Sequence, residues 1–228
     1  MMLAKKVVTP GEAFRVGLDE VWSSGNWVGD KMEQINVVIE IEQPQQRSIY
    51  HDDIVDYLNK FHDPADDGTP HFEVVQNWTF PDEVSTGLTG KPRASEDSGE
   101  YYEKLCDSEK GNQLSSMVEK IEKWGRNNRT VAQVFQVKND LNAMFPPCMM
   151  DCQAFYRNEK VHLTAHFRSH TLCKSYYGDV ISLTKLQEWL ADQVDADVGV
   201  LTIHSGSLHV RKKNGEHELA EKMYEEIV

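Results

Sequence analysis

The stretch FPPCMMDCQAFYRNEKVHLTAHFRSHTLCKSYY, residues 145–177, decides the fold that we predict for the rest of the chain. Cys148 to Phe155 is rich in strand-forming residues, Arg157 to Glu159 has the composition of a tight turn, and Val161 to Phe167 alternates apolar with polar residues. The pattern predicts two paired strands, with a cysteine at the start of the first and Arg168 at the end of the second. A thiol and a guanidinium would then reach the same pocket.

A thiol beside a cation is a candidate nucleophile. A free thiol has a pKa of about 8.5, and a nearby positive charge raises the fraction of thiolate at neutral pH. Arg168 could supply that charge to Cys148, and it could equally bind an anionic ligand. Taken alone, however, the two residues are just as typical of a buried small side chain and a solvated strand end.

Composition limits the class of protein. The chain has 228 residues, of which 39% are hydrophobic and 27% charged, and this fits one α/β domain over residues 1–228. The net charge of −13 argues against a general affinity for nucleic acid. We find no apolar run of membrane-spanning length and no signal-peptide pattern, so we expect a cytoplasmic protein with no membrane partner. The four cysteines lack a C-x-x-C spacing, which predicts free thiols and no metal.

Periodic patterns and caps predict the other elements. Helices are expected over residues 9–25, 51–61, 111–125, 182–194 and 216–228, and further strands over 34–41, 130–137 and 198–210. Thr9-Pro10 opens the first helix, and Gly25 and Gly125 stop two of them. Residues 62–99 are polar with little periodicity, which is typical of a functional or mobile segment.

The second half of the chain, residues 111–211, resembles the thymidylate synthase and pyrimidine hydroxymethylase superfamily. The resemblance depends on the types and spacing of Arg129, Pro147-Cys148, Gln153, Arg168-Ser169, Asp179 and Gly206-Ser207-Leu208-His209. It implies an α/β (α+β) fold, in which a twisted mixed sheet has helices packed on one face. It also implies a homodimer that forms through the other face of the sheet.

The resemblance implies a nucleotide site as well. In this superfamily a cysteine adds to C6 of a pyrimidine nucleotide, so that C5 can attack a one-carbon donor. Cys148 would be this nucleophile. Arg168 and, from the second subunit, Arg129 would bind the phosphate of the nucleotide. Ser169 would also contact the phosphate, and His209 would contact a sugar hydroxyl. Gln153 would orient the network around the thiol.

Asp179 bears on the choice of base. It stands where thymidylate synthases carry asparagine and where deoxycytidylate hydroxymethylases carry aspartate. A neutral aspartic acid, or one that shares a proton with N3, can accept a hydrogen bond from the amino group of cytosine. The resemblance therefore implies a dCMP hydroxymethylase, which transfers a one-carbon unit from 5,10-methylenetetrahydrofolate to C5 of dCMP and adds water to give 5-hydroxymethyl-dCMP. Such an enzyme would serve DNA modification, as in phages with altered cytosine, and would act in the host cytoplasm.

Three matches to the superfamily are loose. Asp53 is the nearest counterpart of a catalytic glutamate, and otherwise a solvated acid near a helix start. Trp78 is matched to a folate-stacking tryptophan, and otherwise anchors a core. Thr171 and Ser175 replace an aspartate and a glycine near the pterin, so the folate is held differently or the donor is another molecule.

Several alternatives stay open. A thymidylate synthase would convert dUMP to dTMP with hydride transfer in place of water. A nucleotide-binding homologue without turnover would explain the departures from the family pattern at Asn128, Thr171, Ser175 and Arg211. Cys148 argues against this second alternative, because binding alone does not require a thiol there. The last alternative is an α/β protein whose resemblance misleads.

Overall fold

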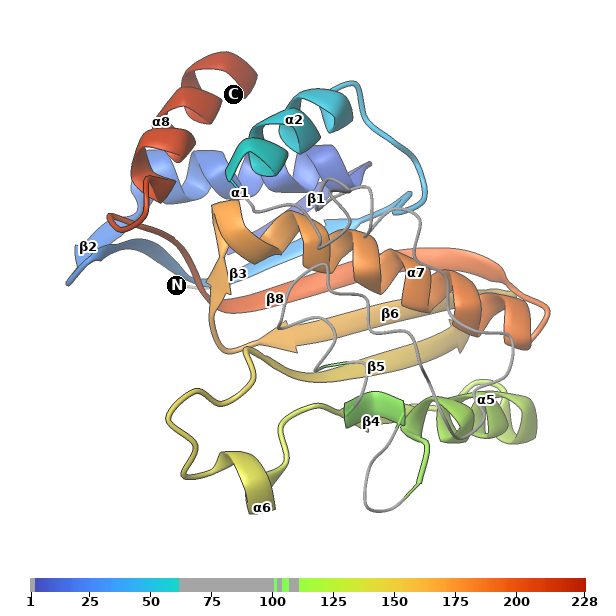
Figure 1. Cartoon of the computed structure of the whole chain (residues 1–228). Coiled ribbons are helices and arrows are strands. Elements are labelled where there is room, and N and C mark those ends of the chain that lie inside the picture. Colours follow the sequence, from blue (N-terminus) through green and yellow to red (C-terminus); the bar gives the residue numbers. More distant parts are fainter. Residues whose placement is uncertain (1–2, 62–100, 102–103, 107–110) are drawn as a thin grey trace.

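The fold, shown in Figure 1, is a mixed α/β arrangement built around one twisted sheet. The computed structural model describes residues 3–61, 101, 104–106 and 111–228. Among these residues the sheet has eight strands, which are β1 (Leu3–Val7), β2 (Asn26–Val28), β3 (Lys31–Ile41), β4 (Val131–Gln133), β5 (Met149–Arg157), β6 (Lys160–Phe167), β7 (His170–Thr171) and β8 (Asp197–Arg211).

The strand order is β1-β3-β8-β6-β5-β4, with β2 paired to β3 and β7 paired to β8. β1 runs parallel to β3, and β6 and β7 run parallel to β8, while the other pairs are antiparallel. The predicted mixed sheet is therefore confirmed.

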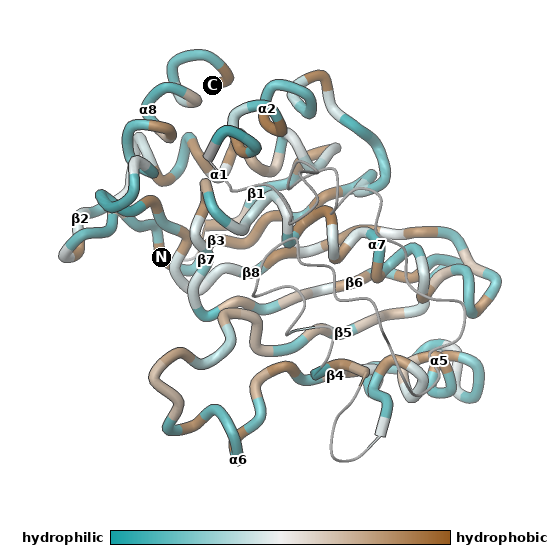
Figure 2. The backbone as a smooth tube through the Cα atoms, viewed as in Figure 1, coloured by the Kyte–Doolittle hydropathy of each residue, from teal (hydrophilic) through white to brown (hydrophobic). Residues whose placement is uncertain are grey.

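The helices of the described residues are α1 (Pro10–Ser24), α2 (His51–Phe61), α5 (Gln113–Trp124), α6 (Val137–Asp140), α7 (Tyr177–Gln193) and α8 (Glu216–Ile227), together with the π-helix η1 (Leu172–Tyr176). Figure 2 shows hydrophilic residues interleaved with hydrophobic ones along α2, α7 and α8, as expected for helices with one buried side. No helix in the described ranges is long and apolar enough to cross a bilayer.

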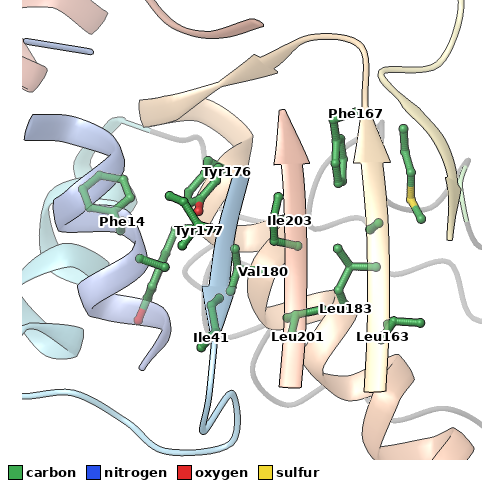
Figure 3. Close-up of a cluster of buried hydrophobic side chains, with 14 of the residues drawn as sticks. Phe14, Ile41, Leu163, Phe167, Tyr176, Tyr177, Val180, Leu183, Leu201 and Ile203 are labelled. Carbon is green, nitrogen blue, oxygen red and sulfur yellow. The ribbon is translucent and has the colours of Figure 1, made fainter. Parts of the chain in front are cut away.

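The core lies between the sheet and the helices α1 and α7. Figure 3 shows Leu163 from β6, Leu201 from β8 and Leu183 from α7 in one buried cluster. Along β6, and along β8 as far as Ser205, every second residue is buried in this way, while the residues between them, such as His166 and His204, are half-buried on the opposite face. Period-two alternation of this kind places helices on one face of the sheet and leaves the other for a different contact.

The β5–β6 hairpin forms as the sequence predicts. Asn158 and Glu159 have positive φ angles of 52° and 60°, and Arg157 pairs with Lys160. A two-residue turn with both φ angles positive matches the twist of antiparallel strands. Cys148 at the start of one strand and Arg168 at the end of the other are thereby brought to the same edge.

The structure differs from the sequence prediction in two segments. The strand expected over 130–137 is only Val131–Gln133 long, and Val137–Asp140 turns into α6. The helix expected over 182–194 begins earlier, at Tyr177, directly after η1. Asp179 therefore lies in the first turn of α7, which the apolar periodicity from Leu183 onward did not indicate.

Gly25 ends α1, but it does not adopt the left-handed conformation that is usual for a glycine at this position. Its φ of −68° is accessible to any residue, but a Cβ atom there would lie 2.2 Å from the carbonyl oxygen of Val21. A close approach of the backbone therefore requires glycine at this position. Gly125, in contrast, ends α5 with a positive φ of 53°.

Two adjacent tyrosines provide a test of the buried core. Tyr177 Oη shares a 2.6 Å hydrogen bond with His51 Nδ1, whereas Tyr176 Oη is buried and has no hydrogen-bond partner among the described residues. Because an unpaired buried hydroxyl is destabilising, Tyr176→Phe should raise the free energy of unfolding by about 1 kcal/mol, and Tyr177→Phe should lower it by about 1 kcal/mol. Urea denaturation measures both, and equal losses in the two variants would contradict the assignment.

Candidate active site

Arg168 holds the segment that carries Cys148. Its backbone N–H donates to the carbonyl oxygen of Cys148 at 2.9 Å, and its Nε and Nη2 donate to the carbonyl oxygens of Pro147 at 3.0 Å and Pro146 at 2.6 Å. The guanidinium is exposed, and Nη1 makes no hydrogen bond within the described part of the chain. The segment that carries the half-buried Cys148 is therefore held against a cation with spare donors.

Gly206 allows this edge of the sheet to close. A Cβ atom at Gly206 would lie 3.0 Å from the carbonyl oxygen of Arg168 and 3.3 Å from that of Phe167. Any larger residue would push β8 away from the end of β6. The glycine that the sequence analysis noted beside Ser207 thus sets the position of Arg168.

The buried cysteines differ from Cys148. Burial raises the pKa of the Cys152 thiol to about 12, and it raises the pKa of the Cys173 thiol well above its ordinary value. Neither thiol can supply a useful fraction of thiolate at neutral pH. Cys148 is half-buried at the edge of the sheet, so it is the better placed nucleophile of these three.

His209 is fixed by a hydrogen-bonded chain at the end of β8. Its Nε2 lies 3.2 Å from Thr171 Oγ1, its Nδ1 lies 3.4 Å from Ser207 Oγ, and Ser207 donates to Glu33 Oε2 at 2.5 Å. Desolvation, reinforced by the charge of Lys31, lowers the pKa of His209 to about 4. The imidazole is therefore neutral at pH 7, and both of its nitrogens are engaged within the protein.

Asp179 reaches the same end of the sheet from α7. It is buried, and its Oδ2 lies 3.0 Å from His170 Nε2. His170 in turn lies with Nδ1 3.1 Å from Ser205 Oγ and stacks on Phe167, with the ring centroids 4.0 Å apart. His170 is not among the site residues predicted from the sequence. Its place directly after Arg168 and Ser169 is the signal that could have indicated it.

The nucleotide residues Arg129 and Gln153 lie away from Cys148 in the same chain. Gln153 follows Cys148 by five residues along β5, a separation of about 16 Å in an extended strand. Its side chain donates to the carbonyl oxygen of Asn128 at 3.0 Å, and the exposed Arg129 guanidinium lies 5.6 Å from the ring centroid of Trp124. These residues form a second group, at the end of the β4–β5 pair that is remote from Cys148.

The remaining candidates have mixed positions. Ser169 is half-buried between Arg168 and β7. Asp53 is exposed on α2, whose buried side carries His51, Ile54 and Leu58. Its catalytic role stays a prediction, because the structure gives it no contact with the Cys148 segment. Trp78 lies outside the described residues.

The folate residues do not fit the contact that the resemblance implies. Thr171 has its hydroxyl engaged by His209, and Ser175 donates to the carbonyl oxygen of Thr171 at 3.4 Å. Neither residue offers a carboxylate that could accept hydrogen bonds from the edge of a pterin. Thr171 and Ser175 therefore do not supply that contact.

The Cys148 segment held by Arg168 and the buried pair of His170 and Asp179 lie in a mixed α/β fold. The sequence matches the family model described as thymidylate synthase over residues 26–226. The chain therefore belongs to the thymidylate synthase family.

Archaeal relatives agree with this assignment. A protein of Methanococcoides burtonii named "Putative thymidylate synthase" is 26% identical over 211 residues, which cover 90% of this chain and 88% of the relative. Proteins of the same name from Methanosarcina barkeri and Methanosarcina mazei are 28% and 35% identical, over 69% and 43% of this chain and 73% and 45% of the relatives.

The difference between the thiols can be measured by alkylation. With iodoacetamide at pH 8, Cys148 should be labelled in the folded protein, whereas Cys152 and Cys173 should be labelled only after denaturation, because burial removes both access and thiolate. Peptide mass mapping gives the sites, and the half-buried Cys106 serves as an internal control. Labelling of Cys152 at the rate of Cys148 would contradict the burial.

Proposed function

We propose that the protein transfers a one-carbon unit to C5 of a pyrimidine nucleoside monophosphate, with Cys148 as the nucleophile. Membership of the thymidylate synthase family supports this reaction class. The observation that carries the proposal is the contact between Arg168 and the Cys148 segment, because it provides a thiol and a phosphate-binding cation at one edge of the sheet.

The chain's own residues account for the activation of the base. The Cys148 thiolate forms a bond to C6 of the pyrimidine, and the electron pair of the C5=C6 double bond moves into the ring, so that C5 becomes nucleophilic. Arg168 binds the phosphate with its spare donors. A sugar hydroxyl that binds His209 has to replace Thr171 as the partner of Nε2. Once C5 has formed its new bond and lost its proton, the C6–S bond breaks and the thiolate is restored.

Two bases compete for the site. The names of the archaeal relatives favour uracil, and hence synthesis of dTMP from dUMP. The buried Asp179 favours cytosine as a second candidate, and with it hydroxymethylation of dCMP, because a carboxyl group can accept from the amino group at C4. Both reactions begin with the same adduct at Cys148.

The donor is the less defined substrate. Members of the family typically use methylenetetrahydrofolate, and we take it as the first donor to test. Because Thr171 and Ser175 do not reproduce the usual pterin contact, no role in donor binding is assigned to them.

We also propose a homodimer that forms through the sheet face opposite α1 and α7. That face carries half-buried side chains that include Val38, Thr164, His166, Thr202 and His204. Arg129 supports the same arrangement, since it is exposed and precedes β4 at the end of that strand that is remote from its own Cys148. A partner subunit could place this guanidinium against the phosphate of its neighbour's nucleotide.

Release of tritium from C5 tests the reaction. The wild-type protein should release tritium from labelled dUMP or dCMP when methylenetetrahydrofolate is present, and mass analysis should show a methyl or a hydroxymethyl product. Cys148→Ser should abolish release, by at least about a thousandfold, because the hydroxyl is a far weaker nucleophile than the thiolate. Cys152→Ser is the matched control on the same strand, and activity that survives in Cys148→Ser would exclude the covalent mechanism.

Mixed dimers test the role of Arg129. Arg129→Ala alone should weaken nucleotide binding by about tenfold or more, since a charge-assisted contact to phosphate is lost. When Arg129→Ala and Cys148→Ser chains are mixed, one site in each heterodimer keeps both wild-type residues, and activity at low nucleotide concentration should exceed that of either component. A mixture that shows only the mean activity of its two components would show that Arg129 does not act across an interface.

A further inference from the structure

We propose that His170 is a positioning residue that sets which pyrimidine base Asp179 selects. It does so by holding one carboxyl oxygen of Asp179 and leaving the other oxygen for the base. The inference rests on the proposed function, because it takes Asp179 to face the pyrimidine ring. The inference extends the proposed function from a class of reaction to the choice of base. His170 favours cytosine as that base.

The hydrogen bonds around His170 define its role. Asp179 Oδ2 lies 3.0 Å from His170 Nε2, and Ser205 Oγ lies 3.1 Å from His170 Nδ1. Oδ1 of Asp179 makes no hydrogen bond to any described residue. Both ring nitrogens of His170 are therefore engaged within the protein, whereas one oxygen of Asp179 stays available to a ligand.

The packing around His170 allows the ring only one orientation. Its side chain is 0% exposed and that of Asp179 is 6% exposed. Phe167 stacks on one side with an interplanar angle of 16°, and Tyr176 lies at an angle of 56° with its ring centroid 4.8 Å away. A histidine fixed in this way cannot turn toward the substrate, so it acts on the substrate only through Asp179.

The position of the proton follows from this geometry. The Ser205 hydroxyl can donate to Nδ1, in which case Nε2 carries the ring proton and donates it to Oδ2 of Asp179. Oδ2 is thereby engaged as an acceptor, and Oδ1 is the acceptor that is left for the base.

The two bases respond differently to an acceptor at Oδ1. Cytosine carries an amino donor at C4, which pairs with Oδ1, whereas uracil carries a carbonyl oxygen there, which would face Oδ1 acceptor to acceptor. A mismatch of this kind leaves buried polar groups unpaired and can discriminate strongly between substrates. The hydrogen bond from His170 thus turns the carboxyl group of Asp179 into a reader of cytosine.

The binding constants of dCMP and dUMP, measured by calorimetry without a donor, test the inference independently of turnover. The wild-type protein should bind dCMP at least about tenfold more tightly than dUMP. His170→Phe should reduce this ratio by about tenfold, because Oδ2 loses its donor. His170→Gln should restore the ratio to within about twofold, because its amide N–H can donate to the same oxygen.

Two further variants separate positioning from packing. Tyr176→Phe changes the ring beside His170 without touching its hydrogen bonds, and it should leave the ratio unchanged within about twofold. Asp179→Asn should shift the preference toward dUMP, and adding His170→Phe to it should then have no further effect on the ratio.

Several outcomes would overturn the inference. One is a wild-type preference for dUMP, and another is a ratio of dCMP to dUMP binding that His170→Phe leaves unchanged. A third is an effect of His170→Phe on this ratio that is equal in the wild-type and the Asp179→Asn backgrounds. A protein that prefers dCMP and responds to His170→Phe, yet releases no tritium with any donor, would remove the proposed function and retain the role of His170. A protein that binds neither nucleotide would overturn both.

Discussion

The pairing of β8 with its neighbours is the constraint on which the rest of the structure depends. This strand pairs with β3 along one edge and with β6 and β7 along the other. It therefore fixes the end of β6, where Arg168 stands, relative to Ser205 and His209. Gly206 allows the approach, since any side chain there would press on the carbonyl oxygen of Arg168. A single strand thus brings together the residues for which we propose contacts to the phosphate, the sugar and the base.

Local sequence was sufficient to predict the hairpin and much of the helix content. The turn at Asn158 and Glu159 and the alternation in β6 are local signals, and they correctly bring Cys148 and Arg168 to one edge. Mixed pairing in the sheet followed from the resemblance, because which strand lies beside β8 is decided by contacts far apart in the sequence. The family assignment followed from residue types at fixed spacing, and the family match confirms it.

The parts that sequence did not predict depend on tertiary contacts. β2 and β7 are too short to show a period, and Val137 to Asp140 turns helical at the end of an apolar run. His170 looked like one polar residue among several, and only the arrival of α7 and β8 gives it Asp179 and Ser205 as partners. For Asp53, a match of sequence pattern could not distinguish the solvent side of α2 from its buried side.

The pairing of β3 with β8 also has a consequence for how the chain folds. Met32 pairs with Val210, and Glu33 accepts a hydrogen bond from Ser207 across a sequence separation of 174 residues. Contacts between such distant segments require closure of a very long loop before they stabilise anything, which is typical of domains that fold slowly. The His209 end of the site therefore completes only after both halves of the polypeptide have met. A fragment that ends before β8 would lack the central strand, so this chemistry cannot be divided into a smaller independent module.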